Sequence, residues 1–154
     1  MRALEPWVAE PLETFLAESA ARLTLLMTSS GQVVAQHGFS RSLDVMSAAA
    51  LGAGIVASTD ELARLMGATP YEALVHNGQR QSCMLAAFPT PRGRWIGLVV
   101  FGPETSVGIV RLFFDRLVRQ LADAAPRDVA AAPPMLAENF ETELDASLKA
   151  LFGR

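Results

Sequence analysis

Apolar and polar positions follow two different periods along the chain, and the changes of period mark the expected elements. Apolar spacings of three and four residues are typical of one helix face, and they predict helices over residues 7–22, 42–66, 107–124 and 135–152. Short runs rich in apolar and β-branched residues predict strands over residues 23–28, 32–36, 71–76, 80–88 and 95–101. Because tight turns join consecutive strands into hairpins, those strands are expected to be antiparallel.

The last two predicted strands are apolar at both alternating sets of positions. In residues 80–88, Cys83 and Leu85 alternate with Met84 and Phe88, and residues 95–101 show the same double pattern. Strands that are apolar on both faces are typical of the centre of a sheet that helices cover on both sides. The sequence therefore predicts helices on both faces of one sheet.

The helix predicted over residues 42–66 is apolar over an arc of roughly 160°, whereas a helix lying on one sheet uses an arc near 100°. One stripe consists of larger residues together with one alanine: Ala48, Leu51, Ile55, Leu62 and Met66. The adjoining stripe consists mostly of small residues: Val45, Ala49, Gly52, Val56 and Ala63. Because small side chains permit close approach of two backbones, we expect the second stripe to pack against another helix.

Composition excludes several classes of protein. Cys83 is the only cysteine, which excludes an internal disulfide framework and any multi-cysteine metal site. A net charge of −3 argues against broad nucleic-acid binding. The longest apolar run, residues 48–57, is half the length of about 20 residues that a spanning helix needs. The first residues also lack the apolar core of a signal peptide, so we expect a cytoplasmic protein.

No set of residues predicts an active site, a metal site or a cofactor site. The sequence Gly52-Ala53-Gly54-Ile55-Val56-Ala57 matches a dinucleotide fingerprint, but it lies inside a predicted helix with no strand leading into it. Cys83 has the surroundings of a buried core thiol. Arg92 and Arg94 lie at a predicted hairpin tip, where a solvated turn is favoured over an arginine finger for a GTPase. We therefore expect an interaction protein and not an enzyme.

Four segments resemble the Roadblock (dynein light-chain) domain family: the hairpin over residues 23–36 around Ser30-Gly31, the helix over 42–66, the hairpin over 74–80, and residues 95–111. The last two of these segments, and the ending over residues 144–154, most resemble bacterial gliding-motility members of the family. The resemblance covers about residues 23–125 at the level of the domain.

The resemblance implies an α+β, profilin-like fold with three layers in the order α/β/α. It implies a five-stranded antiparallel sheet of order 2-1-5-4-3, with the long helix on one face and the first and last domain helices on the other. The corresponding organisation is a Roadblock domain over residues 1–125, an Ala/Pro linker over 126–134 and a C-terminal amphipathic helix over 135–154.

The resemblance also implies a homodimer in which the long helices pack and the third strands pair. Together with the small-residue stripe, it predicts an interface of Val45, Ala49, Gly52, Val56, Tyr71, Leu74 and His76. The implied partner is a Ras-like small GTPase of the MglA type, whose hydrolysis would be accelerated through its own switch loops without a donated arginine. The tail helix would contact the GTPase separately and aid nucleotide exchange. The expected partner-binding residues are Met46, Ala53, Phe140, Leu144, Leu148 and Leu151.

Two other functions stay open at the level of sequence. The first is a Roadblock scaffold, a dimer that holds two proteins together without affecting GTP hydrolysis. The second is a small-molecule sensor of profilin-like build. A deep apolar cavity ringed by polar groups would favour the sensor.

The tail generates a first prediction. Pro126, Pro133 and Pro134 separate residues 135–154 from the domain, and a helix of that length is only marginally stable alone in water. Deleting residues 133–154 should therefore lower affinity for the GTPase, or its exchange rate, while the dimer and the thermal midpoint change little. A truncated chain that aggregates, or that melts many degrees lower, would show instead that the tail belongs to the core.

Overall fold

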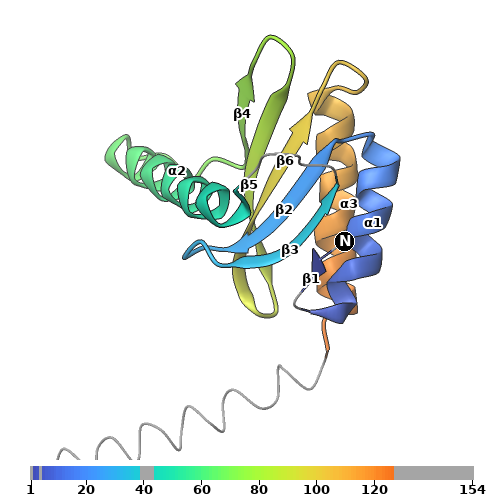
Figure 1. Ribbon diagram of the computed structural model, residues 1–154. Helices are drawn as coiled ribbons and strands as arrows, with labels where there is room; N and C mark the ends of the chain where they lie inside the picture. Colours follow the sequence, from blue (N-terminus) through green and yellow to red (C-terminus); the bar gives the residue numbers. More distant parts are fainter. Residues whose placement is uncertain (1, 4, 39–43, 127–154) are drawn as a thin grey trace, which may run out of the picture. The chain divides into compact units, whose positions relative to one another are not determined.

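One antiparallel sheet of six strands organises the protein, in the order β1-β3-β2-β6-β5-β4 (Figure 1). The computed structural model describes residues 2–3, 5–38 and 44–126. Within them the strands are β1 (Arg2–Ala3), β2 (Leu23–Thr28), β3 (Val33–Gly38), β4 (Leu74–Asn77), β5 (Ser82–Thr90) and β6 (Gly93–Phe101). The five strands predicted from the sequence are present in the predicted order. β1 is an addition, pairing with Gln36 and Ala35 of β3 at the edge of the sheet.

Three helices cover the two faces of the sheet: α1 (Pro6–Ser19), α2 (Val45–Leu65) and α3 (Val107–Ala124). As predicted, α2 lies on one face, and α1 and α3 lie on the other (Figure 1). Residues 1–124 form one compact unit. The predicted tail helix, and all of the predicted linker except Pro126, lie outside the described residues.

Local chemistry determines where α1 and α2 begin. A proline stands at the start of α1, where its missing N–H would have no intrahelical acceptor. The carboxylate of Asp44 caps α2 by accepting hydrogen bonds from Ser47 N (3.2 Å) and Ser47 Oγ (2.7 Å). These hydrogen bonds to the ionised form lower the pKa of Asp44. The long helix therefore begins at Val45, three residues later than the sequence predicted.

The core has two parts, one on each face of the sheet. On the face of α1 and α3, an aromatic cluster joins Phe15, Phe88, Trp95 and Phe114, and Phe114 makes edge-to-face contacts with Phe15 (5.9 Å) and Phe88 (5.5 Å). On the face of α2, the sheet contributes large side chains, among them Leu25, Met27, Leu85 and Ile96. The residues of α2 that contact them have small side chains.

The strand boundaries differ from the prediction in the region of β4. The predicted strand began at Tyr71, whereas β4 begins at Leu74 and pairs only with Ser82–Leu85 of β5. β5 and β6 run on together to a tight turn, so that Thr90 is paired with Gly93. The outer side of residues 86–90 consequently has no neighbouring strand among the described residues.

Gly97 of β6 explains how closely α3 packs on the sheet. A Cβ atom at this position would lie 2.5 Å from Cε2 and 2.7 Å from Cζ of Phe114. The Phe114 ring is buried and held by Phe15 and Phe88, so it cannot move aside without disturbing both contacts.

We therefore predict that Gly97→Ala lowers the free energy of unfolding by about 1–3 kcal/mol, because it overpacks this aromatic cluster. Gly54→Ala in α2 is the matched control, since a Cβ there meets no atom within 4 Å and alanine is the better helix former. The control should be as stable as the unaltered chain or slightly more stable. Denaturant titration of both variants tests the prediction, and equal stability of Gly97→Ala and the unaltered chain would contradict it.

Candidate interaction surfaces

α2 contacts the sheet through a row of small residues, which we call the sheet-facing row: Ala49, Gly52, Ala53, Val56 and Ala63. All five are buried, and Val45 packs partly against the same cluster. The sequence predicted that one stripe of α2 contacts a second helix: Val45, Ala49, Gly52 and Val56. That prediction is wrong about the direction in which these residues point. They contact the sheet of their own chain.

The reason for this arrangement is the size of the side chains that the sheet presents. A Cβ built on Gly52 would lie 3.3 Å from Cδ2 of Leu85 and 3.4 Å from Cε of Met27. Large residues on the sheet therefore require small residues on the helix, so that the two can approach closely. The periodicity of the sequence shows two apolar stripes but does not show which of them faces the sheet.

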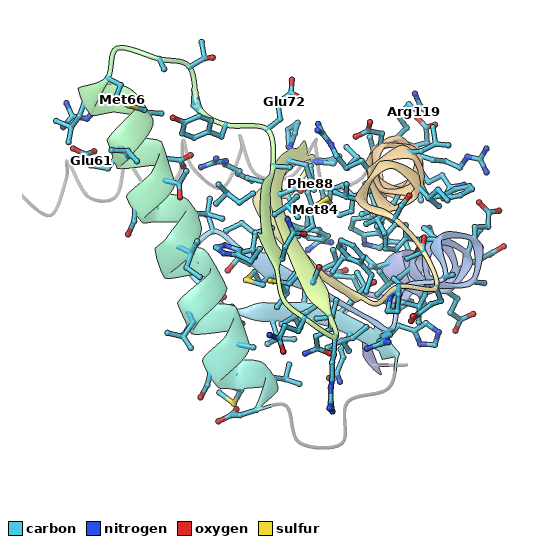
Figure 2. All side chains as sticks on the ribbon, turned by 90° about the horizontal axis from the view of Figure 1, so that it is seen from above. Glu61, Met66, Glu72, Met84, Phe88 and Arg119 are labelled. Atoms are coloured by element: carbon cyan, nitrogen blue, oxygen red, sulfur yellow. The ribbon has the colours of Figure 1, made fainter. Side chains whose placement is uncertain are left out.

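The other apolar stripe of α2 is exposed, and we call it the large-residue row: Leu51, Ile55, Leu62 and Met66. These side chains are 39–68% exposed, and the neighbouring Leu65 is 73% exposed. Figure 2 shows Met66 at the end of the helix, away from the sheet. Contiguous exposed apolar side chains of this size indicate a protein–protein contact.

A third row on α2 is exposed and consists of small residues: Ala50, Gly54 and Ala57. This small-residue row continues toward Met46, which is 78% exposed. It lies on the side of the β2–β3 hairpin, since the Cα of Ala50 is 3.2 Å from a Cβ built on Gly31. Ala53, which was predicted to bind a partner, is instead buried against the sheet.

β4 is an open edge of the sheet within the described residues, because it pairs only with β5. At the opposite edge, β1 covers part of β3. His76 is exposed on β4 and Tyr71 is exposed just before it, whereas Leu74 is half-buried and packs against the cluster under α2. Leu74 and Thr59 line the same narrow gap. Because Thr59 lies one turn beyond Ile55, β4 and the large-residue row are on the same side of the molecule.

Cys83 lies opposite His76 on the neighbouring strand. Burial raises the pKa of its thiol, and a hydrogen bond with the backbone of His76 acts in the opposite direction. A raised pKa keeps the thiol protonated, which is unfavourable for a nucleophile. Cys83 is half-buried and belongs to neither core cluster, so the prediction of a buried core thiol is wrong about its burial.

The two arginines near the β5–β6 turn are both held in ion pairs. Arg92 lies 2.9 Å from the carboxylate of Glu5, and Arg94 makes two hydrogen bonds with Asp60 at 2.6 and 3.3 Å. The hydrogen bond to Asp60 raises the pKa of Arg94. Arg92 therefore links the turn to the start of α1, and Arg94 links it to α2. Both side chains have a structural role.

Besides the narrow gap beside Leu74, larger hollows indent the surface of the described residues. One of about 510 Å³ lies between α1 and α3, one of about 460 Å³ lies between β3 and the start of α2, and one of about 310 Å³ lies between β5 and α3. Within the described residues, no group of three His, Cys, Asp or Glu side chains is arranged to hold a metal ion. No helix in that part of the chain is long and apolar enough to cross a membrane. Four further residues predicted to bind a partner lie outside the described residues: Phe140, Leu144, Leu148 and Leu151.

No protein-family model matches the chain, and no curated protein matches it in sequence. Solved structures do match. MglB from Myxococcus xanthus is 25% identical with a TM-score of 0.71, and the match covers 78% of this chain and 95% of that one. The gliding protein MglB from Thermus thermophilus is 29% identical with a TM-score of 0.68, over 77% of this chain and 88% of that one.

A Roadblock/LC7 domain from Streptomyces avermitilis shares the fold at 16% identity, with a TM-score of 0.61 over 77% of this chain and 93% of that one. The strand order and the placement of the helices are those expected for the Roadblock fold, and the matches to MglB structures indicate the same fold. The chain is therefore a protein of the Roadblock fold that is similar to MglB.

Proposed function

We propose that the protein is a non-enzymatic regulator of a Ras-like small GTPase and acts as a homodimer in cell polarity or motility. The observation that carries the proposal is the exposed large-residue row of α2, in a chain that is 25–29% identical to MglB proteins. The resemblance implies that such a dimer accelerates GTP hydrolysis by reshaping the switch loops of the GTPase.

The spacing of the large-residue row favours a two-fold contact between antiparallel α2 helices. Leu51 and Met66 are equally far from the Ser58–Thr59 peptide bond, and so are Ile55 and Leu62. An antiparallel pair centred on that bond would place Leu51 of one copy against Met66 of the other, and Ile55 against Leu62. Such self-complementary contacts are what a two-fold axis requires.

The polar residues at the centre of this contact already have hydrogen-bond partners. Ser58 Oγ donates to the carbonyl oxygen of Gly54, and Thr59 Oγ1 donates to that of Ile55, both at 2.8 Å. Burying these hydroxyls between two helices would therefore leave no donor unpaired. The open β4 edge lies on the same side, so that a second copy could extend the sheet there.

The contact generates a prediction about assembly. Leu62→Arg should convert the dimer to a monomer at micromolar concentration, because a charge would be buried between the helices. The control is Leu112→Arg on α3, which replaces an equally large and more exposed leucine outside the proposed contact. Sedimentation equilibrium distinguishes the two outcomes. A Leu62→Arg variant that remains dimeric would refute this interface.

The small-residue row and Met46 form the surface that we assign to the GTPase. It faces away from the large-residue row, so a dimer contact through that row would leave it accessible. Small side chains allow a partner to approach the helix backbone closely, and Gly54 has free space around it. A large residue at Gly54 would then obstruct a partner without disturbing the fold.

The decisive test measures GTP hydrolysis by a candidate GTPase alone, with the unaltered chain, and with Gly54→Arg. We expect stimulation by the unaltered chain and its loss with Gly54→Arg, while Gly54→Ala stimulates normally. Binding without any change in hydrolysis would favour the scaffold function. Absence of both binding and stimulation would refute the proposed function for that GTPase.

The ion pairs of Arg92 and Arg94 support a mechanism without a donated arginine. We expect Arg92→Ala and Arg94→Ala each to retain stimulation within about tenfold, because a true arginine finger contributes about 10³–10⁵. Single-turnover hydrolysis at saturating regulator measures this directly. A loss of a thousandfold in either variant would show that the arginine acts on the transferred phosphate.

A further inference from the structure

The cavity of about 310 Å³ lies between β5 and α3, on the face of the sheet opposite α2. It lies beside the part of β5 that β4 does not reach: Leu74, the first residue of β4, pairs with Leu85, so residues 86–90 of β5 have no outer neighbour in the described part of the chain. Figure 2 shows Met84 and Phe88 between the strand and α3, with Glu72 above them. The segment of Glu72 and Ala73 forms the outer wall.

The floor of this cavity consists of apolar side chains, most of them buried. Its main residues are Met84, Ala86 and Phe88 from β5, with Phe114 and Val118 from α3. Phe88 and Phe114 hold each other edge to face at 5.5 Å between ring centroids. The short side chain of Ala86 leaves space between these larger residues, and the volume lies at the lower end of the range of about 300–1,000 Å³ for small-molecule sites.

Three charged residues surround the mouth. Arg111 of α3 pairs with Glu72 at 3.2 Å, and their side chains are 47% and 89% exposed. Such an exposed pair contributes little to the stability of the fold. Asp115, one turn further along α3, forms no ion pair or hydrogen bond with the described residues. The mouth therefore carries two carboxylates and one guanidinium that is already engaged.

We propose that this cavity binds a small hydrophobic amine. An apolar body of about one aromatic ring would fill the floor, and the protonated amino group would lie at the mouth beside Asp115 and Glu72. A carboxylic acid of the same shape is disfavoured, because it would meet two carboxylates at the mouth. The proposal does not depend on the GTPase.

A ligand in this cavity would contact the segment that connects α2 to β4. Those two elements carry the proposed contacts between the copies, and Glu72 and Ala73 lie between them in the sequence. Occupation of the cavity would therefore hold that connection in one conformation.

The test titrates three probes of one shape into the full-length chain: phenethylamine, 2-phenylethanol and 3-phenylpropanoic acid. Backbone amide chemical shifts report the site and the affinity. We expect saturable binding of the amine at millimolar concentration or below, weaker binding of the alcohol and weakest binding of the acid. The shifts should concentrate in residues 84–88 and 111–118. Binding of the acid as tightly as the amine, shifts concentrated elsewhere, or no saturable binding of the amine would overturn the proposal.

Two variants separate the charge from the shape of the site. Asp115→Asn should weaken binding of phenethylamine about tenfold, the loss expected for one charge-assisted hydrogen bond. Asp123→Asn, an exposed aspartate on the same helix that does not line this cavity, is the matched control and should bind normally. Ala86→Leu should weaken all three probes by filling the floor. If that variant does not fold, the two aspartate variants decide alone, and equal affinities for them would overturn the assignment.

Discussion

The close contact between α2 and the sheet determines which surfaces the molecule has available. Met27 and Leu85 project from the sheet so far that only small residues fit opposite them, and Gly52 marks the tightest point. The larger apolar residues of α2 are consequently on its outer side. An isolated chain would expose them to water, so the packing of the core creates the need for a second surface.

The open edge of the sheet and the outer residues of α2 together determine which surfaces are exposed. β1 protects part of β3, whereas β4 has no strand on its outer side among the described residues. β4 and the large-residue row lie on one side, and the small-residue row lies toward the β2–β3 hairpin. In the function that we propose, self-association uses the side of β4 and partner binding uses the side of the β2–β3 hairpin.

Periodicity and turn chemistry predicted most of the fold. The succession of the five longer strands along the chain and the bounds of α3 agree with the structure, because these elements have a clear period and are bounded by Gly and Pro. The order of the strands within the sheet was implied by the family resemblance, and it also agrees with the structure. β1 has only two residues and therefore no period to detect. The orientation of α2 could not be read from its sequence, because it depends on the side chains that the sheet presents to it. The cavity beside Ala86 was also beyond prediction, because the pattern placed the start of this strand at Tyr71 and β4 begins only at Leu74.

The measurement that tests the central claim most directly is a distance between the two copies, taken by electron paramagnetic resonance in a Cys83→Ser background. Spin labels at Ala57 and, separately, at Ala50 would sit on the exposed small-residue row without entering the proposed contact. Antiparallel α2 helices centred on Ser58–Thr59 predict that the Ala50 pair is more than about 10 Å further apart than the Ala57 pair, since each copy adds seven residues at about 1.5 Å. Equal distances at the two positions, or no dipolar coupling at either, would contradict this account.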